Sequence, residues 1–271
     1  MDVKKQDFCI ITFSSGEPYL SESENLQALC EQSGIQFKLY TFEWLKTTSF
    51  YKENKPLLDS RKAGFCAWKP FIILDALKQY KKILYLDSSM LFNKDHIQEF
   101  INLNDTLLST ETALKNVFYT KQETFEIMDA VSDRYMDAYQ VWAGVILATM
   151  KAEPLLKEWL YYCKIRECIS NEGNKEKNPL VRYHLFDQSI YSILYERHLM
   201  ERTENYRINY DANDYYYFFI DTREESHIPI VVRDFGEDII VKQDNLIMNF
   251  FPEYETNGSC CYIPENSLER V

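Results

Sequence analysis

Short apolar runs alternate with helix-like patterns along the first two thirds of the chain. The runs at 8–15, 35–42, 83–87 and 141–149 have the length and composition of β-strands. Between them, apolar residues recur every three or four positions, as they do on the buried face of a helix. This alternation predicts an α/β fold with a mainly parallel central sheet that is flanked by helices.

Two of the expected helices begin at charged residues. Pro70 suits the first turn of a helix that starts at Lys69, and Ile73 and Leu77 lie on one face of that helix. The segment 187–198 has a similar apolar face and begins with an aspartate. Both helix starts are therefore positions where a charged side chain can face a site rather than the core.

The chain changes character after residue 200. The segment 201–271 contains short strand-like runs and loops, and no linker, repeat or low-complexity stretch separates it from the rest. We therefore expect a single domain over 1–271 with an irregular C-terminal part. The polar stretch 46–62 is expected to be a loop within this domain.

Acidic residues outnumber basic ones by 42 to 30, which gives a net charge of −12. Such a surface repels phosphate backbones and excludes general nucleic-acid binding, so a small phosphate-bearing ligand would need basic residues or a metal ion beside it. The seven cysteines form no CxxC pair, so neither a disulfide framework nor a zinc site is expected. The sequence has no signal-peptide-like start and no run near ~18 apolar residues. We therefore expect no transmembrane segment and a cytoplasmic location.

The strand expected at 83–87 ends in an unusual way, on Asp87-Ser88-Ser89. Ligands of open α/β sheets gather beyond the carboxyl ends of the strands. An aspartate at that place can hold a divalent cation or accept a hydrogen bond from a ribose hydroxyl. The alternative is that Asp87 ends the strand and stabilises a turn.

Four short motifs, this strand end among them, resemble those of a group of nucleotide-sugar-dependent glycosyltransferases with the GT-A (Rossmann-like) fold. The resemblance covers roughly residues 8–200, and the four motifs occur in the same order. The matching positions are Gly64-Phe65 together with Trp68-Lys69-Pro70 as one motif, then Tyr85-Leu86-Asp87-Ser88-Ser89, Ala143-Gly144 and Phe186-Asp187-Gln188-Ser189.

The resemblance implies a nucleotide-binding half at 1–102 that holds a nucleotide-sugar donor. It also implies a second half at 103–200 that shapes the site for a hydroxyl acceptor, with 201–271 as a C-terminal extension. In many such enzymes an Asp-x-Asp motif holds Mn²⁺ or Mg²⁺ on the diphosphate. Here Ser89 stands in place of the second aspartate, and a serine is a poor ligand for a hard cation. The resemblance therefore leaves open a divalent cation held by Asp87 alone, or none.

Basic residues just before this strand end could offset the phosphates. Lys69 starts a helix, whose N-terminus favours anions, and Arg61 and Lys62 lie upstream, although each could also be a solvated surface charge. Ser14 and Ser15 follow the first strand at the same sheet edge, where their hydroxyls suit a base or a ribose, or simply form a turn. The donor-binding candidates are therefore Ser14, Ser15, Lys62, Trp68, Lys69, Asp87, Ser88 and Ser89.

Glycosyl transfer needs a group that takes the proton of the acceptor hydroxyl as this hydroxyl attacks the anomeric carbon. If the enzyme inverts the configuration, one carboxylate suffices as general base, and Asp187 is the candidate. The alternative role of Asp187 is to cap the helix that it begins. The remaining candidates for acceptor or sugar binding are Gln140, Ala143, Gly144, His184 and Gln188.

Two other functions remain open from the sequence. A sugar-phosphate nucleotidyltransferase would use similar residues, but it typically has a glycine-rich phosphate loop after the first strand, where this chain has only Gly16. A glycan-binding module that has lost catalysis would keep the fold without the second aspartate. The sequence does not give the donor, the acceptor, the stereochemistry or the oligomeric state.

Overall fold

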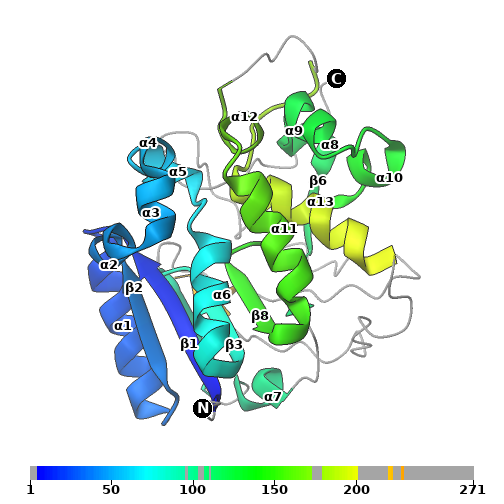
Figure 1. Ribbon diagram of the computed structural model, residues 1–271. Helices are drawn as coiled ribbons and strands as arrows, with labels where there is room; N and C mark the ends of the chain where they lie inside the picture. Colours follow the sequence, from blue (N-terminus) through cyan, green and yellow to red (C-terminus); the bar gives the residue numbers. More distant parts are fainter. Residues whose placement is uncertain are drawn as a thin grey trace.

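The computed structural model describes residues 5–94, 97–102, 107–109, 111–172, 179–200, 219–221 and 227–228 of the chain. Its centre is a five-stranded sheet with the strand order β2-β1-β3-β8-β5 (Figure 1). These strands are β1 (Gln6–Ser14), β2 (Phe37–Thr41), β3 (Tyr80–Leu86), β5 (Leu107–Leu108) and β8 (Val145–Thr149).

The strand directions confirm the expected fold class. β1 pairs in parallel with both β2 and β3, whereas β8 runs antiparallel to both β3 and β5. Within this sheet, β8 therefore opposes the common direction of its neighbours. Helices cover both faces, so the protein is an α/β protein with a mainly parallel central sheet, as predicted.

The apolar runs become strands because both faces of the sheet are covered. Along β1, Ile11 belongs to a large hydrophobic cluster on one face, and Ile10 belongs to a smaller cluster on the other. Ile83 and Leu84 of β3 divide between the two clusters in the same way. All four side chains are fully buried, which is why these strands appear in the sequence as continuous apolar runs.

The longer helices form a layer on each side of the sheet (Figure 1). Leu26 of α1 and Ile97 of α7 join the smaller cluster, while Leu77 of α6, Trp159 of α11 and Ile190 of α13 join the larger one. Helices α6 and α13 begin at the residues that the sequence predicts. These helices are α1 (Tyr19–Gln32), α6 (Lys69–Gln79), α7 (Ile97–Asn102), α11 (Glu153–Cys163) and α13 (Asp187–Met200).

Shorter elements connect these layers. The helices among them are α2 (Phe42–Thr47), α3 (Ser49–Glu53), α4 (Lys55–Leu58), α5 (Arg61–Phe65), α8 (Asn116–Tyr119), α9 (Gln122–Ile127), α10 (Asp133–Met136), α12 (Arg166–Ile169) and the 3₁₀ helix at Met150–Ala152. The strands among them are β4 (Met90–Phe92), β6 (Glu111–Lys115), β7 (Tyr139–Val141), β9 (Phe219–Asp221) and β10 (His227–Ile228).

Two local expectations are wrong. The apolar run 141–149 is not one strand, because β7 ends at Val141 and β8 begins at Val145. The polar stretch 46–62 is not simply a loop, since it contains α3 and α4. The hydroxyl of Thr48 accepts a hydrogen bond from the Tyr51 amide and so caps α3, which lets a polar segment form a short helix.

The strand order creates a switch point between β1 and β3. From β1 the chain crosses to β2 on one side, and it later enters β3 on the other side. Ligands of open α/β sheets bind outside the carboxyl ends of the strands at such a point. Ser14 is the last residue of β1, and Asp87 follows directly after β3. The first serine and the aspartate of the sequence analysis therefore stand at the same edge of the sheet.

The expected C-terminal part is described only at 219–221 and 227–228, where β9 pairs with β4 and β10. The rest of 201–271 lies outside the described residues, and the expected division into halves stays a prediction. In the described part of the chain, no helix has the length and apolar character that crossing a membrane requires.

Candidate functional site

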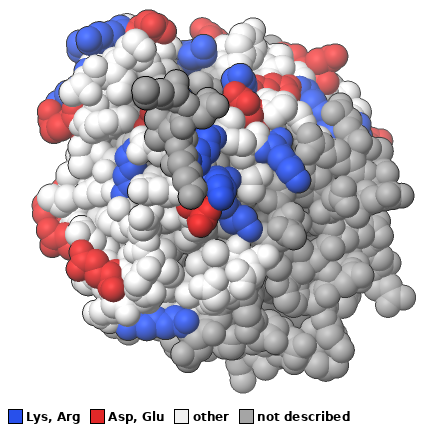
Figure 2. All heavy atoms as spheres, turned by 60° about the horizontal axis from the view of Figure 1, so that its bottom comes forward, with Lys and Arg blue, Asp and Glu red and all other residues white. Residues whose placement is uncertain are grey.

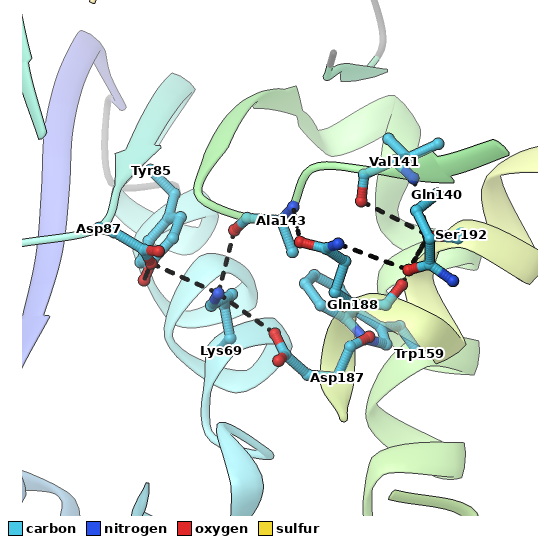
Figure 3. Close-up of polar contacts among 10 residues, drawn as sticks. All are labelled: Lys69, Tyr85, Asp87, Gln140, Val141, Ala143, Trp159, Asp187, Gln188 and Ser192. Atoms are coloured by element: carbon cyan, nitrogen blue, oxygen red, sulfur yellow. Dashed lines mark hydrogen bonds and ion pairs between the residues drawn. The ribbon is translucent and has the colours of Figure 1, made fainter. Parts of the chain in front are cut away.

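Lys69 forms the centre of a charged cluster at the carboxyl edge of the sheet (Figure 3). Its ammonium nitrogen, Nζ, lies 3.4 Å from Oδ1 of Asp87 and 3.2 Å from Oδ2 of Asp187. It also donates a hydrogen bond of 3.0 Å to the backbone oxygen of Ala143. The cluster therefore joins the start of α6, the end of β3, the turn before β8 and the start of α13.

Burial divides the cluster into a hidden and an accessible part. The side chains of Lys69 and Asp187 are each 6% exposed, whereas that of Asp87 is 33% exposed. Burial by itself lowers the pKa of Lys69, but the carboxylates of Asp187 and Asp87 hold this pKa well above its ordinary value. Lys69 thus stays charged, and two carboxylates around one ammonium leave the cluster with one net negative charge.

Tyr85 orients the accessible carboxylate. Its hydroxyl donates a hydrogen bond of 2.5 Å to Oδ1 of Asp87, the oxygen that also faces Lys69. Burial and the Asp87 carboxylate raise the pKa of Tyr85 well above its ordinary value, so the phenol stays protonated and remains a donor. Sequence reasoning missed this role, although Tyr85 belongs to one of the matching motifs.

The other oxygen of Asp87 lies beside Gly144. A Cβ atom on Gly144 would come within 3.0 Å of Oδ2 of Asp87 and within 2.7 Å of the Trp142 indole nitrogen. Only a residue without a side chain fits there unless its neighbours shift. The glycine therefore keeps space around Oδ2.

The turn that leads into Lys69 has a left-handed backbone. Lys62, Ala63, Phe65 and Cys66 all have φ between +50° and +66°, a range that non-glycine residues rarely adopt. Phe186, directly before Asp187, has φ of +55°. Two strained segments therefore precede the two buried charges of the cluster.

These two strained segments pack against each other. The rings of Phe65 and Phe186 lie 5.3 Å apart, and Nζ of Lys62 lies 5.4 Å from the centre of the Phe186 ring. The contact fixes the approach to Lys69 relative to the approach to Asp187. It also brings Lys62, a donor-binding candidate, next to the residue that precedes Asp187.

Gln188 connects the cluster to a buried polar network (Figure 3). Its Oε1 accepts a hydrogen bond of 3.2 Å from the Ala143 amide, and its Nε2 donates one of 3.4 Å to Oε1 of Gln140. Gln140 is completely buried, and its Nε2 donates to the side-chain oxygens of Asn116 and Thr120. The structure therefore places Gln140 in the interior, with its amide bonded inside the fold, and only Gln188 reaches the cluster.

Ser192 is a further member of this network that sequence reasoning missed. Its hydroxyl donates a hydrogen bond of 2.7 Å to the Gln188 backbone oxygen, lies 3.2 Å from Gln140 Oε1, and accepts a hydrogen bond of 2.8 Å from the Val141 amide. No local sequence pattern marks Ser192, because two of its partners, Gln140 and Val141, lie on β7, far away in the sequence.

His184 lies in the interior and contacts the backbone. Its Nδ1 accepts a hydrogen bond of 3.4 Å from the Lys121 amide, and its Nε2 faces the Cys168 backbone oxygen at 3.1 Å. Burial, and then the charge of Lys121, lower the pKa of His184 to about 3, so the ring is neutral at ordinary pH. Both ring nitrogens are used within the fold, and the structure does not bring them to the Lys69 cluster.

The aromatic side of the site is formed by Trp68. Its ring stacks on Phe13 of β1, with the ring centres 3.8 Å apart and an angle of 18° between the planes. Ser14 is 2% exposed, and its hydroxyl lies 3.4 Å from the Gly16 amide. Ser15 is exposed. Of Ser14 and Ser15, Ser15 is therefore the one that a ligand can reach directly.

The two serines after Asp87 have different surroundings. Ser88 donates a hydrogen bond of 3.1 Å to Oε2 of Glu22 on α1, and Ser89 is 1% exposed. Glu22 was not a candidate from the sequence, because nothing local links the first turn of α1 to the end of β3. This contact fixes α1 to the turn that carries Asp87.

Comparisons with known proteins give distant structural matches. No protein-family model and no curated protein matches the sequence. One match is a glycosyltransferase involved in glycosylating the major capsid of PBCV-1, with 16% identity, 75% of this chain and 81% of that chain covered, and a TM-score of 0.42. A second is mouse xyloside xylosyltransferase 1, with 12% identity, coverages of 76% and 85%, and a TM-score of 0.38.

A third match is the galactosyltransferase LgtC in complex with donor and acceptor sugar analogues, with 18% identity, coverages of 69% and 70%, and a TM-score of 0.34. All three are described as glycosyltransferases, the class that the sequence motifs resemble. At these identities and TM-scores, the likeness alone decides neither the activity nor the substrates of this chain.

Proposed function

We propose that this protein is a glycosyltransferase that moves a sugar from a nucleotide-diphosphate donor to a hydroxyl group of an acceptor. One observation carries the proposal. Asp87, with a partly exposed carboxylate, follows β3 at the switch point of the sheet and shares the Lys69 ammonium with Asp187. The switch point is the place where open α/β sheets bind nucleotides, and the second carboxylate supplies a group for the chemistry.

The donor-binding side comprises the ends of β1 and β3 and the turn before α6. Oδ2 of Asp87 can accept a hydrogen bond from a hydroxyl of the ribose or of the donor sugar. Ser15 is exposed next to β1, and Trp68 packs on Phe13 beside it. Lys62 is the basic candidate for the phosphates, because the Lys69 ammonium already has three acceptors around it.

Asp187 is the proposed general base. The Lys69 ammonium at 3.2 Å stabilises its ionised form, which is the form that accepts a proton. In the proposed step the acceptor oxygen bonds to the anomeric carbon while the bond from that carbon to the diphosphate breaks. The acceptor proton moves to Asp187, and the diphosphate leaves with the bonding electron pair. This direct displacement inverts the configuration at the anomeric carbon.

A thermal-shift screen with UDP-, GDP-, dTDP- and CMP-sugars tests the donor. A ligand that binds only the folded state raises Tm, so one diphosphate donor is expected to raise it, and the monophosphate CMP-sugar is the comparison. Asp87→Ala should remove this shift. Asp75→Asn, which changes a carboxylate that also faces a lysine and a tyrosine away from the site, should keep it.

Turnover of the donor that binds tests the base. Asp187→Asn should keep the Tm shift while lowering donor hydrolysis and transfer at least about 100-fold, since loss of a general base typically costs that much. Full turnover in this variant would assign the base to another residue. Formation of pyrophosphate from a nucleoside triphosphate and a sugar phosphate would instead indicate a nucleotidyltransferase. Glycan binding without donor binding would indicate a binding module.

A further inference from the structure

The residues around Asp87 do not fit the divalent cation that the family resemblance leaves open. Mg²⁺ and related hard cations need several oxygen ligands, usually with one or two carboxylates among them. Within the described residues, no group of three or more His, Cys, Asp or Glu side chains could hold a metal ion. The serines of the motif add little, because Ser89 is 1% exposed and the hydroxyl of Ser88 is engaged in a hydrogen bond to Oε2 of Glu22.

The space between the two carboxylates already holds a positive charge. The Lys69 ammonium lies 3.4 Å from Asp87 and 3.2 Å from Asp187, and its remaining hydrogen bond goes to the Ala143 oxygen. A metal ion held by both carboxylates would have to displace this buried group. A metal ion next to it would meet a like charge that water screens poorly.

We propose that the site binds its nucleotide sugar without a divalent cation, because the Lys69 ammonium takes the place of that cation between Asp87 and Asp187. This inference rests on the glycosyltransferase function proposed above. Oδ1 of Asp87 is used by Lys69 and Tyr85, while Oδ2 lies on the side of Gly144. Asp87 therefore acts through Oδ2 as an acceptor for a donor hydroxyl rather than as a metal ligand.

A second lysine–aspartate–tyrosine cluster in the same chain provides a matched comparison. Lys38 lies 3.3 Å from Oδ2 of Asp75, and the Tyr40 hydroxyl donates a hydrogen bond of 2.8 Å to the same oxygen. Removing Lys38 therefore leaves one carboxylate, which still faces Lys78 at 3.5 Å, whereas removing Lys69 leaves two carboxylates that face a common space. Only the second change should create a place where a divalent cation can bind.

Electron paramagnetic resonance of Mn²⁺ alone tests this exchange without any nucleotide. The signal of free Mn²⁺ should be unchanged by the wild-type chain and by Lys38→Ala. It should fall by about one equivalent with Lys69→Ala, because two carboxylates then share the vacated space. The double variant Lys69→Ala/Asp187→Asn should not bind this additional equivalent of Mn²⁺.

Two outcomes of the metal titration would overturn the proposal. The first is a wild-type chain that binds one equivalent of Mn²⁺ and loses it in Asp87→Asn. The second is a folded Lys69→Ala variant, checked by circular dichroism, that gains no Mn²⁺ binding. If Lys69→Ala does not fold, the titration of the wild-type chain still decides whether the site holds a metal ion or the Lys69 ammonium in its place.

A second experiment measures the Tm shift produced by the nucleotide sugar in the presence of EDTA and in the presence of Mn²⁺. Equal shifts support the proposal, and a shift that EDTA abolishes overturns it. If no nucleotide sugar shifts Tm under either condition, the proposed glycosyltransferase function fails, while the titration with Mn²⁺ alone still tests the role of Lys69.

Discussion

Lys69 illustrates how one side chain can fix several segments of a chain. Its three acceptors are Asp87 after β3, Ala143 before β8 and Asp187 at the start of α13. An ammonium group has three N–H bonds, so each acceptor can receive one. Substituting Lys69 by a neutral residue would leave the buried Asp187 carboxylate without its cation, which is far more costly than the loss of an exposed ion pair.

At the same scale, His184 makes the stability of the fold depend on pH. The folded-state pKa of about 3 lies below the ordinary value of 6.5, because burial disfavours the charged ring. As the pH falls from 6.5 towards 3, the unfolded chain takes up a proton that the folded chain does not. The free energy of unfolding should therefore fall by about 1.4 kcal/mol per pH unit in this window from this residue.

Urea unfolding at pH 7.5, 6.0 and 5.0 measures this slope. In His184→Gln the slope between pH 6.0 and 5.0 should be smaller than in the wild type by about 1 kcal/mol per unit. The variant also loses stability at pH 7.5, so the comparison concerns slopes rather than absolute values. Equal slopes in the two proteins would show that His184 does not titrate as described.

The sequence predicts some residues of the site because they stand at element boundaries. Asp87 is visible as a carboxylate at the end of an apolar strand, and Lys69 and Asp187 are visible as charges at helix starts. The burial of Gln140 and the contact of Glu22 with Ser88 were not predictable in this way. Both depend on partners far away in the chain, which no local pattern reveals.

At the scale of elements, the left-handed turn before α6 is the most unusual feature. A residue with a Cβ atom in this conformation costs about 1–2 kcal/mol relative to its right-handed form. Several successive residues adopt it at positions 62–66, and their strain is offset by the packing of Phe65 against Phe186. The segment therefore lowers local stability but holds the chain just before Lys69 in a fixed position.

Glycine at Ala63 should relieve part of this strain. Ala63 has φ of +50°, a conformation that glycine adopts without cost, so Ala63→Gly should leave the free energy of unfolding unchanged or raise it by up to about 1 kcal/mol. Ala28 is exposed in the right-handed helix α1, and Ala28→Gly should lower the free energy of unfolding by about 1 kcal/mol. Urea unfolding measures both, and equal losses in the two variants would contradict the left-handed assignment.

The sequence predicts a strand correctly where both faces of the strand are buried, and it fails where a turn interrupts an apolar run. The runs that became β1 and β3 are continuous because both of their faces are covered. The run 141–149 looks equally continuous, but Gly144 has to stay close to Asp87 and the chain turns there. Apolar composition cannot show such a turn, since Gly144 there lies against Asp87, a residue that follows a different strand.

The whole molecule carries its charge unevenly. Although the net charge is −12, Figure 2 shows Lys and Arg side chains gathered near the centre of one face. At the amino ends of β1 and β3, Lys81 lies 2.6 Å from Asp7, while Lys5 and Lys82 donate to backbone oxygens. These lysines are far along their strands from Asp87, so they do not offset the acidic charge near the site.

The excess of acids predicts a response to salt. Like charges repel one another in the compact state, and about 0.15 M salt shortens the range of this repulsion to about 8 Å. Tm should therefore rise when NaCl is raised from a few millimolar to this concentration. Glu24→Lys changes the net charge from −12 to −10 at an exposed position, since −12 + 2 = −10, and should raise Tm more at low than at high salt. A wild-type Tm that falls with added NaCl would contradict this expectation.

The contact of one ammonium with two carboxylates also constrains how this protein can diverge. A chain that lost the lysine would keep two anions facing each other, whereas a chain that lost either anion would keep one ammonium balanced by one carboxylate. Related chains should therefore lose one of the two carboxylates more readily than the lysine, and a chain without the lysine should carry another cation in its place, for instance a bound metal ion.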